Sequence, residues 1–114
     1  MDDCLFCRIA NGVIPVELLH NDELVAAFRD INPQAPTHIL IVPKAHIADV
    51  TQVGAGDGLL LARIMQVAAE LAQREGIATT GFRLVANTGP NAGQTVPHLH
   101  FHLIGGRVLG WPPG

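Results

Sequence analysis

The stretch His98-Leu99-His100-Phe101-His102-Leu103-Ile104 decides the fold, because it alternates histidines with apolar residues. In an extended strand, residues two apart point to the same side of the sheet. We therefore predict a strand over 98–104 whose apolar residues enter the core and whose three histidines share the other face. Three neighbouring imidazoles are costly to desolvate without partners, and they titrate near neutral pH. This favours a cleft that moves protons or holds a metal ion over a merely solvated face.

The composition indicates one compact domain covering residues 1–114. Of the 114 residues, 48% are hydrophobic and 15% are charged, which suits a folded chain with a single core. The net charge of −3 and the scattered Lys and Arg argue against nucleic acid as the main partner, although a small phosphate ligand fits. No apolar run reaches the roughly 20 residues of a membrane span, and the N-terminus lacks the features of a signal peptide. We therefore expect a cytoplasmic protein.

The remaining pattern predicts an α+β domain. Apolar spacing predicts a long helix over 57–74, capped by Asp57 and stopped by Gly76, and a short helix over 5–10 that ends at Asn11-Gly12. Together with 98–104, five strands are expected, the other four over 17–20, 24–29, 38–43 and 82–86. The first two are close enough to pair as a hairpin. One long helix among five strands favours a five-stranded antiparallel sheet over repeated βαβ units.

A glycine-containing loop, Asn87-Thr88-Gly89-Pro90-Asn91-Ala92-Gly93-Gln94-Thr95, precedes the histidine stretch. Such loops offer backbone N–H groups and a hydroxyl to an oxyanion or a phosphate. Clusters of this composition are more often plain turns. The position directly before the histidines favours the phosphate interpretation.

Several dispersed motifs resemble one known family. The pattern at 98–104 matches the His-φ-His-φ-His-φ-φ signature of the histidine triad (HIT) family, where φ is hydrophobic. The segments 30–38, 42–44 and 110–114 are similar to its branch of histidine triad nucleotide-binding phosphoramidases (HINT-like), in particular the zinc-containing bacterial type. The resemblance extends from Cys4 to Gly114. It implies the HIT fold and a two-fold homodimer, in which the tail 108–114 reaches the neighbouring subunit's site.

The resemblance also implies a chemistry for named residues. His100 is expected to attack the phosphorus of a purine nucleoside monophosphate derivative and to form a covalent nucleotidyl-histidine, which water then hydrolyses. A hydrogen bond from its other nitrogen to a nearby backbone carbonyl is expected to orient it. His102 is expected to donate to the phosphate oxygens together with backbone N–H groups of 93–95. Thr95, where the family more often has Ser, is the expected partner of the leaving group, and Pro97 stands where Tyr is common.

The same family resemblance also implies a nucleotide pocket. Asp30 is expected to accept hydrogen bonds from the ribose hydroxyls. The walls of the base pocket are expected to be Phe6, Ile9, Phe28, Ile31 and Leu40, although about half of such apolar positions are core in any protein. Asn87, Gly93 and Gln94 are expected near the phosphate. The expected substrate is a purine nucleoside phosphoramidate, with a dinucleoside polyphosphate as the alternative.

Cys4 and Cys7 form a Cys-x-x-Cys motif, which indicates zinc, a redox pair or two buried thiols. A thioredoxin-like redox role expects a βαβ context that the pattern lacks. By resemblance, His46 and His98 complete a structural zinc site. In family members without zinc the first triad histidine instead joins the equivalent of His38 in a hydrogen-bonded relay, so both roles stay open for His98.

Two other classes of protein fit parts of the sequence. In a cupin-like, metal-dependent hydrolase the three alternating histidines would together bind a catalytic metal, but Cys4 and Cys7 would then have no function. A nucleotide-binding regulator without turnover would not need the full set of catalytic groups. His20 is interpreted as a surface or hairpin histidine, and Trp111 either as an interface anchor or as a local packing residue.

Overall fold

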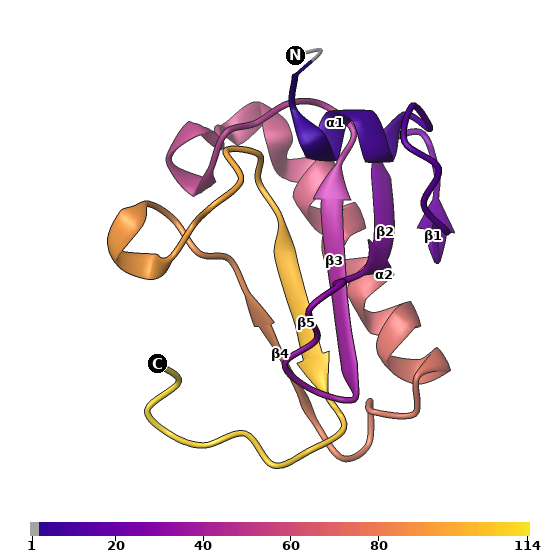
Figure 1. The fold of residues 1–114 in the computed structure, drawn as a ribbon, viewed down its shortest axis with the longest axis vertical. Coiled ribbons are helices and arrows are strands. Elements are labelled where there is room, and N and C mark those ends of the chain that lie inside the picture. The colour runs from indigo at the N-terminus through magenta and orange to yellow at the C-terminus, as the bar shows by residue number, and fades with distance from the viewer. Residues whose placement is uncertain (1–2) are drawn as a thin grey trace.

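The computed structural model describes residues 3–114 as one antiparallel sheet with helices on both faces (Figure 1). The five strands lie in the order β1-β2-β3-β5-β4, and every neighbouring pair is antiparallel. Their bounds are β1 His20–Asn21, β2 Val25–Arg29, β3 Thr37–Pro43, β4 Phe82–Val85 and β5 Phe101–Gly105. The helices are α1 Leu5–Ala10 and α2 Gly58–Arg74, with short 3-10 turns at Val50–Gln52, Ala55–Asp57 and Pro90–Ala92. The predicted α+β class and antiparallel sheet are confirmed.

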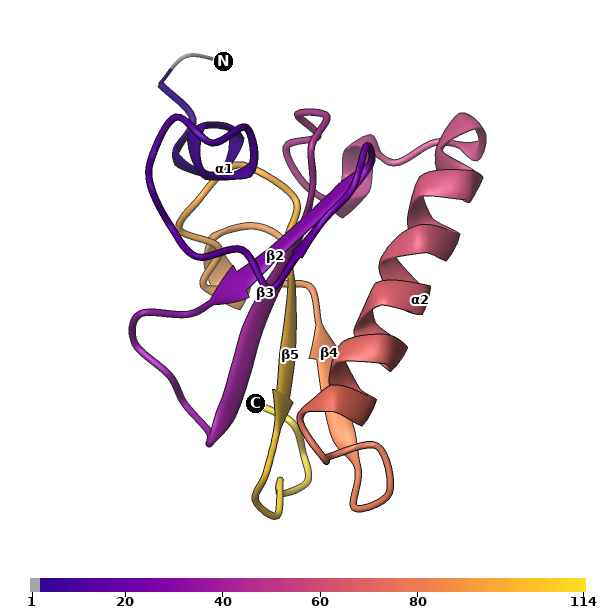
Figure 2. The ribbon, with the colours of Figure 1, turned by 90° about the vertical axis from the view of Figure 1, so that its right-hand side faces the viewer.

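Helix α2 covers one face of the sheet, as the side view shows (Figure 2). Its buried residues pack against alternate residues of the strands, including Ile39 and Leu103, which lie opposite each other in β3 and β5. Facing residues of an antiparallel pair share a side, so Leu40 and His102, the next pair along, belong to the other face. His102 therefore lies on the face of the sheet that α2 does not cover.

The short helix α1 packs on that other face. Phe6, Ile9 and Ala10 form a second core cluster with Ala26, Phe28, Leu40 and Val42 of the central strands. The helix has the predicted bounds, and Asn11 closes it by donating from Nδ2 to the Cys7 carbonyl at 2.7 Å. This second core cluster lies beneath the side chains of the site that is described below.

Two predicted strands, β1 and β5, are each two residues shorter than expected, and β2 and β4 are each one residue shorter. The hairpin of β1 with β2 is confirmed, but β1 contains only His20 and Asn21 rather than 17–20. The histidine strand begins at Phe101 rather than His98, because the preceding backbone bonds elsewhere: His98 N donates to Val96 O, and Leu99 N donates to Ile47 O at 2.6 Å. His98 and His100 are thus presented from a loop that enters the strand.

The beginning of α2 also differs from the prediction. Asp57 makes no side-chain hydrogen bond to the first turn of α2. Its carboxylate instead accepts from Gly54 N at 2.9 Å and closes the 3-10 turn that runs directly into the helix. The helix ends as expected, since Gly76 follows with a left-handed φ of 75°.

His20 has partners that the sequence did not indicate. Its Nε2 lies 2.6 Å from Asp22 Oδ2, and Arg63 of α2 donates to the same oxygen at 2.9 Å. These contacts hold the pKa of the Asp22 carboxyl far below its usual range even though burial opposes the shift; the lowering comes from His20, backbone N–H groups and Arg63. The cluster ties the β1–β2 hairpin to α2 and lies outside the site described below.

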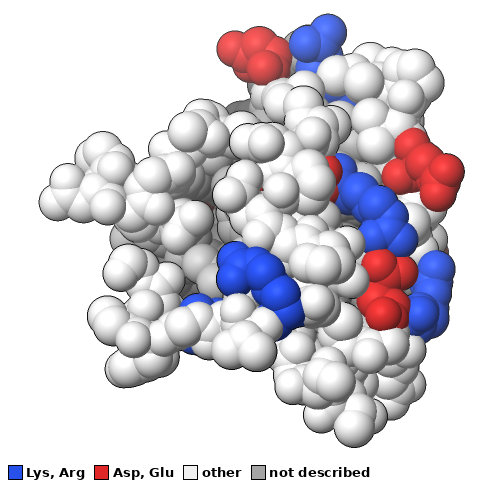
Figure 3. All heavy atoms as spheres, turned by 60° about the horizontal axis from the view of Figure 1, so that its bottom comes forward, with Lys and Arg blue, Asp and Glu red and all other residues white. Residues whose placement is uncertain are grey.

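The surface drawn in Figure 3 is mostly uncharged, and its basic and acidic side chains are scattered, with the two signs adjoining at one side. This matches the low charged fraction of the sequence. Among residues 3–114, no helix is long and apolar enough to cross a membrane.

Candidate active site

His100 is oriented by one hydrogen bond, which leaves its second ring nitrogen free. Its Nδ1 lies 2.7 Å from the backbone carbonyl oxygen of His98, and a carbonyl only accepts, so Nδ1 carries the proton. In the neutral form of the ring, Nε2 is therefore the nitrogen that carries the lone pair. The ring is buried and packs edge-on against Phe6, with ring centroids 4.9 Å apart. An imidazole oriented in this way is a nucleophile at neutral pH.

His102 is held in the opposite tautomer by a chain of hydrogen bonds. Gln34 N donates to His38 Nδ1 at 3.0 Å, so the proton of His38 is on Nε2. That Nε2–H donates to His102 Nδ1 at 2.8 Å, and the proton of His102 is therefore on its own Nε2. Burial, followed by the charges of His100 and His38, lowers the pKa of His102 to about 4. Near neutral pH, His102 is thus an uncharged hydrogen-bond donor.

Both histidines line a cavity of about 320 Å³ on the α1 side of the sheet. Asp30 lies at this cavity with its Oδ2 3.5 Å from His38 Nε2, while its Oδ1 accepts from Asn32 N at 2.8 Å. The lining includes the predicted residues Phe6, Ile9, Phe28, Asp30, Ile31, Leu40, Thr95, His100 and His102. The cavity is therefore an apolar slot with a carboxylate and two imidazoles.

Four further residues line this cavity and were not expected from the sequence: Leu5, Val16, Arg29 and Val96. Leu5, Val16 and Val96 are ordinary apolar residues in a chain that is nearly half hydrophobic, so no sequence signal separates them from the core. Arg29 is the last residue of β2 and directly precedes the predicted site residue Asp30, so its place at the cavity could have been expected. Adjacency to a predicted site residue was the one usable signal.

The loop before the histidines is closed by Gln94. Its side chain accepts from Gly89 N at 3.0 Å and donates to Ala48 O at 2.9 Å and to Val96 O at 3.1 Å. The N–H groups of Gly93 and Gln94 donate within the loop, to Pro90 O and Gly89 O respectively. Asn87, Gly93 and Gln94 are not among the residues that line the cavity, whereas Thr95 is exposed at its edge.

A second cluster brings the two cysteines together with two histidines. Cys4 Sγ and Cys7 Sγ lie 3.3 and 3.4 Å from His98 Nδ1, and Cys7 Sγ lies 3.3 Å from His46 Nδ1. The four ligand atoms are all within 4.8 Å of one another. His98 Nε2 donates to Pro43 O at 2.8 Å, which leaves Nδ1 unprotonated and facing the sulfurs. The cluster can hold a metal ion.

This geometry separates the roles of the three alternating histidines. His98 lies with the cysteines, and it is His102 that contacts His38. The relay between His98 and His38 that the resemblance left open is therefore not formed. The shared metal site of a cupin-like hydrolase is not formed either, because among residues 3–114 one cluster of potential ligands contains His98, another contains His102, and neither contains His100. His98 is nevertheless connected to His100 through its own carbonyl oxygen.

Comparison with known proteins points in one direction. A family model described as the HIT domain matches residues 11–109. A purine nucleoside phosphoramidase of Escherichia coli is 49% identical over 109 residues, which cover 96% of this chain and 92% of that protein. A HIT family hydrolase from Legionella pneumophila, with a solved structure, is 53% identical with a TM-score of 0.96, covering 98% of this chain and 100% of that one. A histidine triad nucleotide-binding protein from Candida albicans is 32% identical with a TM-score of 0.82, covering 96% of this chain and 83% of that one.

Proposed function

Since this chain belongs to the histidine triad (HIT) family, we propose that it is a HIT-type hydrolase that cleaves purine nucleoside phosphoramidates through a nucleotidyl-histidine intermediate. The observation that carries the proposal is the His100 imidazole, whose Nδ1–H is bound to the His98 carbonyl so that Nε2 is free at the cavity. Similarity to a purine nucleoside phosphoramidase over nearly the whole chain supports the choice of substrate.

In the first step the lone pair of His100 Nε2 forms a bond to phosphorus, and the phosphorus–nitrogen bond of the substrate breaks. The electron pair of that bond goes to the leaving amine, which takes up a proton passed from solvent water by the Thr95 hydroxyl. In the second step water adds to phosphorus, releases a proton to solvent, and returns the bonding pair to His100 Nε2. The products are the amine and the nucleoside monophosphate.

The phosphate oxygens gain charge during both steps, and donors at fixed positions stabilise that charge. His102 supplies its Nε2–H, since Nδ1 already accepts from His38. Of the three N–H groups of residues 93–95, those of Gly93 and Gln94 bond within the loop, so we assign the backbone contact to Thr95. We assign Gly93 and Gln94 the role of shaping this loop, with Asn87 beside it.

The nucleoside is proposed to occupy the apolar part of the 320 Å³ cavity. Its base would pack against Phe6, Ile9, Phe28, Ile31 and Leu40, while the Asp30 carboxylate would accept from the ribose hydroxyls. Asp30 Oδ2 suits this role because Oδ1 is already occupied by Asn32 N.

We propose that Cys4, Cys7, His46 and His98 bind zinc. Two thiolates and two imidazole nitrogens are a common donor set of closed structural zinc sites, and the sulfur–nitrogen separations of 3.3 to 3.4 Å approach the roughly 3.6 Å edge of a tetrahedron with ordinary zinc bonds. Bound zinc would supply stability and no catalytic step. These four residues would fix α1 to the two loops that carry His46 and His98.

We also propose a homodimer in which the sheets of two subunits run together along β4. This strand lies at an edge of the sheet, and exposed edges are prone to pairing. Exposed apolar residues lie on α2, on β4 and on the tail that follows β5, including Leu59, Met65, Phe82, Val108 and Trp111. In this dimer the tail 108–114 would approach the partner's site, with Trp111 as an anchor.

The decisive experiment compares wild type with His100→Ala under single-turnover conditions, using adenosine 5′-phosphoramidate, guanosine 5′-phosphoramidate and a dinucleoside polyphosphate as substrates. We expect hydrolysis of a phosphoramidate by wild type and a rate at least roughly 10³-fold lower for the variant. Zinc content is measured on the same samples to show that the metal site is unaltered. Equal rates would exclude His100 as the nucleophile, and no turnover of any substrate by wild type would favour a regulatory binding protein.

A further inference from the structure

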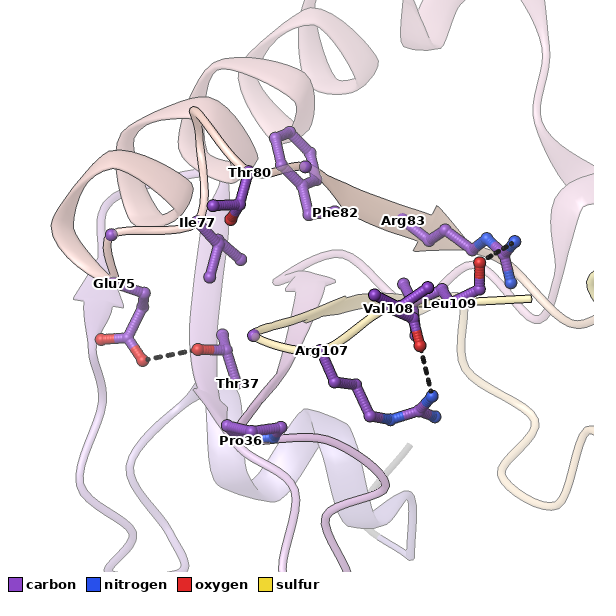
Figure 4. Close-up of a pocket in the computed structure, with 13 residues that line it drawn as sticks. Pro36, Thr37, Glu75, Ile77, Thr80, Phe82, Arg83, Arg107, Val108 and Leu109 are labelled. Carbon is purple, nitrogen blue, oxygen red and sulfur yellow. Dashed lines mark hydrogen bonds between the residues drawn. The ribbon is translucent and has the colours of Figure 1, made fainter.

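The turn that follows β5 packs directly on the loop that leads into β3. Gly106 has a left-handed φ of 91°, and a Cβ atom at this position would lie 2.9 Å from the Pro36 Cβ. Only glycine fits such a conformation and such a close approach without displacement. Figure 4 shows Pro36 beside Arg107 at this junction, at the end of the sheet where β5 ends and β3 begins. The two segments therefore form one contact unit.

Arg107 connects this turn to the loop by hydrogen bonds. Its Nε donates to Gln34 O at 3.1 Å, and its Nη1 donates to Val108 O at 3.1 Å. Figure 4 shows the second of these bonds and, on the opposite side of the tail, the bond from Arg83 to Leu109 O. Both arginines thus hold the tail, but of the two it is Arg107 that also donates to the 30–36 loop.

Gln34 is the residue whose N–H sets the state of the catalytic histidines. That N–H donates to His38 Nδ1, and His38 Nε2–H in turn donates to His102 Nδ1. Arg107 therefore binds the carbonyl oxygen of Gln34, and the N–H of the same residue fixes the tautomers of His38 and His102. A shift of Gln34 would leave His38 Nδ1 without its donor, and His38 would then no longer be restricted to the Nε2–H form.

We propose that Arg107 is a positioning residue for the hydrolysis: by holding Gln34, it keeps His38 and His102 in the tautomers that direct the His102 Nε2–H at the phosphate. The inference rests on the proposed function, because it uses the role of His102 at the phosphate. Arg107 does not line the nucleotide cavity, so it acts through Gln34 and His38.

The rest of the loop has its own supports, which limits the expected effect. Asp30 N donates to His38 O at 3.0 Å, and Asn32 N donates to the Asp30 carboxylate. Loss of the Arg107 bond should therefore leave Asp30 at the nucleotide cavity and loosen mainly the Gln34 end. We expect a lower kcat with little change in KM, the signature of an interaction that matters in the transition state.

The test uses Arg107→Met, Arg107→Lys and Arg83→Met with adenosine 5′-phosphoramidate. Arg107→Met removes the donors, and Arg107→Lys keeps a single donor that can reach Gln34 O. Arg83→Met removes the same charge and the bonds from Arg83 to the tail at Leu109 O and Gly110 O, so it is the matched control. Nitrogen-15 NMR of labelled histidines reads the His38 and His102 tautomers independently of activity, and circular dichroism verifies folding.

We expect kcat to fall about three- to tenfold in Arg107→Met, with KM within about twofold, and to recover in part in Arg107→Lys. The NMR signals of His38 should lose the pure Nε2–H pattern in Arg107→Met and keep it in Arg83→Met. An unchanged pattern in Arg107→Met, or equal losses of kcat in both methionine variants, would overturn the proposal. If wild type hydrolyses nothing, the proposed function fails, while the NMR comparison still decides whether Arg107 controls the tautomers.

Discussion

At the scale of single residues, the site depends on which nitrogen of each imidazole carries the proton. His98 and His100 are fixed by carbonyl acceptors, Pro43 O and His98 O, whereas His38 is fixed by a backbone N–H donor. Acceptors place a proton on the bound nitrogen and donors exclude it. The backbone groups around each histidine thus determine which ring nitrogen is the donor, and histidines of the same site acquire different functions for this reason.

The lowered pKa of His102 predicts a dependence of stability on pH. Its pKa is about 4 in the folded protein against 6.5 for an unperturbed histidine, so between these values the unfolded chain binds a proton that the folded chain does not. The free energy of unfolding should therefore decrease as the pH falls from about 6.5 to about 4. His102→Gln, which cannot titrate, should show a smaller decrease. Urea denaturation of both proteins across this range measures the difference.

Other ionisable groups also contribute to the dependence of stability on pH, but they do so equally in wild type and in His102→Gln. The difference between the two pH profiles therefore reports on His102. Parallel profiles would mean that His102 has an ordinary pKa in the folded protein.

The partners of individual histidines were the part of the site least accessible to sequence reasoning. The alternation at 98–104 indicated that the histidines share a site, and the Cys-x-x-Cys motif together with the family resemblance indicated a zinc site. The contact of His38 with His102 required the register of β3 with β5, which places Leu40 opposite His102 and His38 opposite Ile104. A pattern along one strand does not contain that register.

At the scale of elements, the cysteine–histidine cluster joins the beginning of α1 to the loops that carry His46 and His98. Cys7→Ser removes one of the four proposed zinc ligands, so we expect bound zinc to fall well below one equivalent. The melting temperature should fall by roughly 10 °C, since a loss of about 2 kcal/mol has that effect in a domain of this size. Calorimetry and metal analysis of the same samples measure both effects.

Hydrolysis by Cys7→Ser should remain within about tenfold of wild type, because the Pro43 carbonyl still anchors His98 and thereby His100. As the control, zinc is removed from wild type and restored. Restoration should raise the melting temperature of wild type and not that of the variant. A variant with full zinc content would exclude Cys7 as a ligand.

Helix α2 stabilises the sheet from the face opposite the site, so its core residues should affect stability and not catalysis. Ile64 is fully buried against the sheet, and Ile64→Ala should lower the free energy of unfolding by about 3 kcal/mol. Gln73→Ala, an exposed position on the same helix, should change it by less than about 0.5 kcal/mol. Urea denaturation gives both values. A loss of kcat per folded molecule in Ile64→Ala would show that the two faces are coupled.

Element types were more predictable than element limits. Apolar periodicity, turn residues such as Asn11-Gly12 and the short spacing of the first two strands are local properties of the sequence, and together they were sufficient for α1, α2 and the antiparallel sheet. The beginning of β5 depends on the bond from Leu99 N to Ile47 O, and Asp57 closes the preceding turn through Gly54 rather than capping α2. These limits are set by partners distant along the chain or by competing local turns, which periodicity does not encode.

At the scale of the whole molecule, the exposed apolar residues of α2 and β4 predict the dimer. Met65 is 43% exposed on α2, and in a monomer Met65→Lys would be nearly neutral. In a dimer it would bury a charge at the interface and separate the subunits. Light scattering coupled to size exclusion should therefore give the mass of two chains for wild type and of one chain for the variant. Gln52→Lys adds the same charge at the exposed turn before α2 and should stay dimeric; a wild-type mass of one chain would refute the dimer.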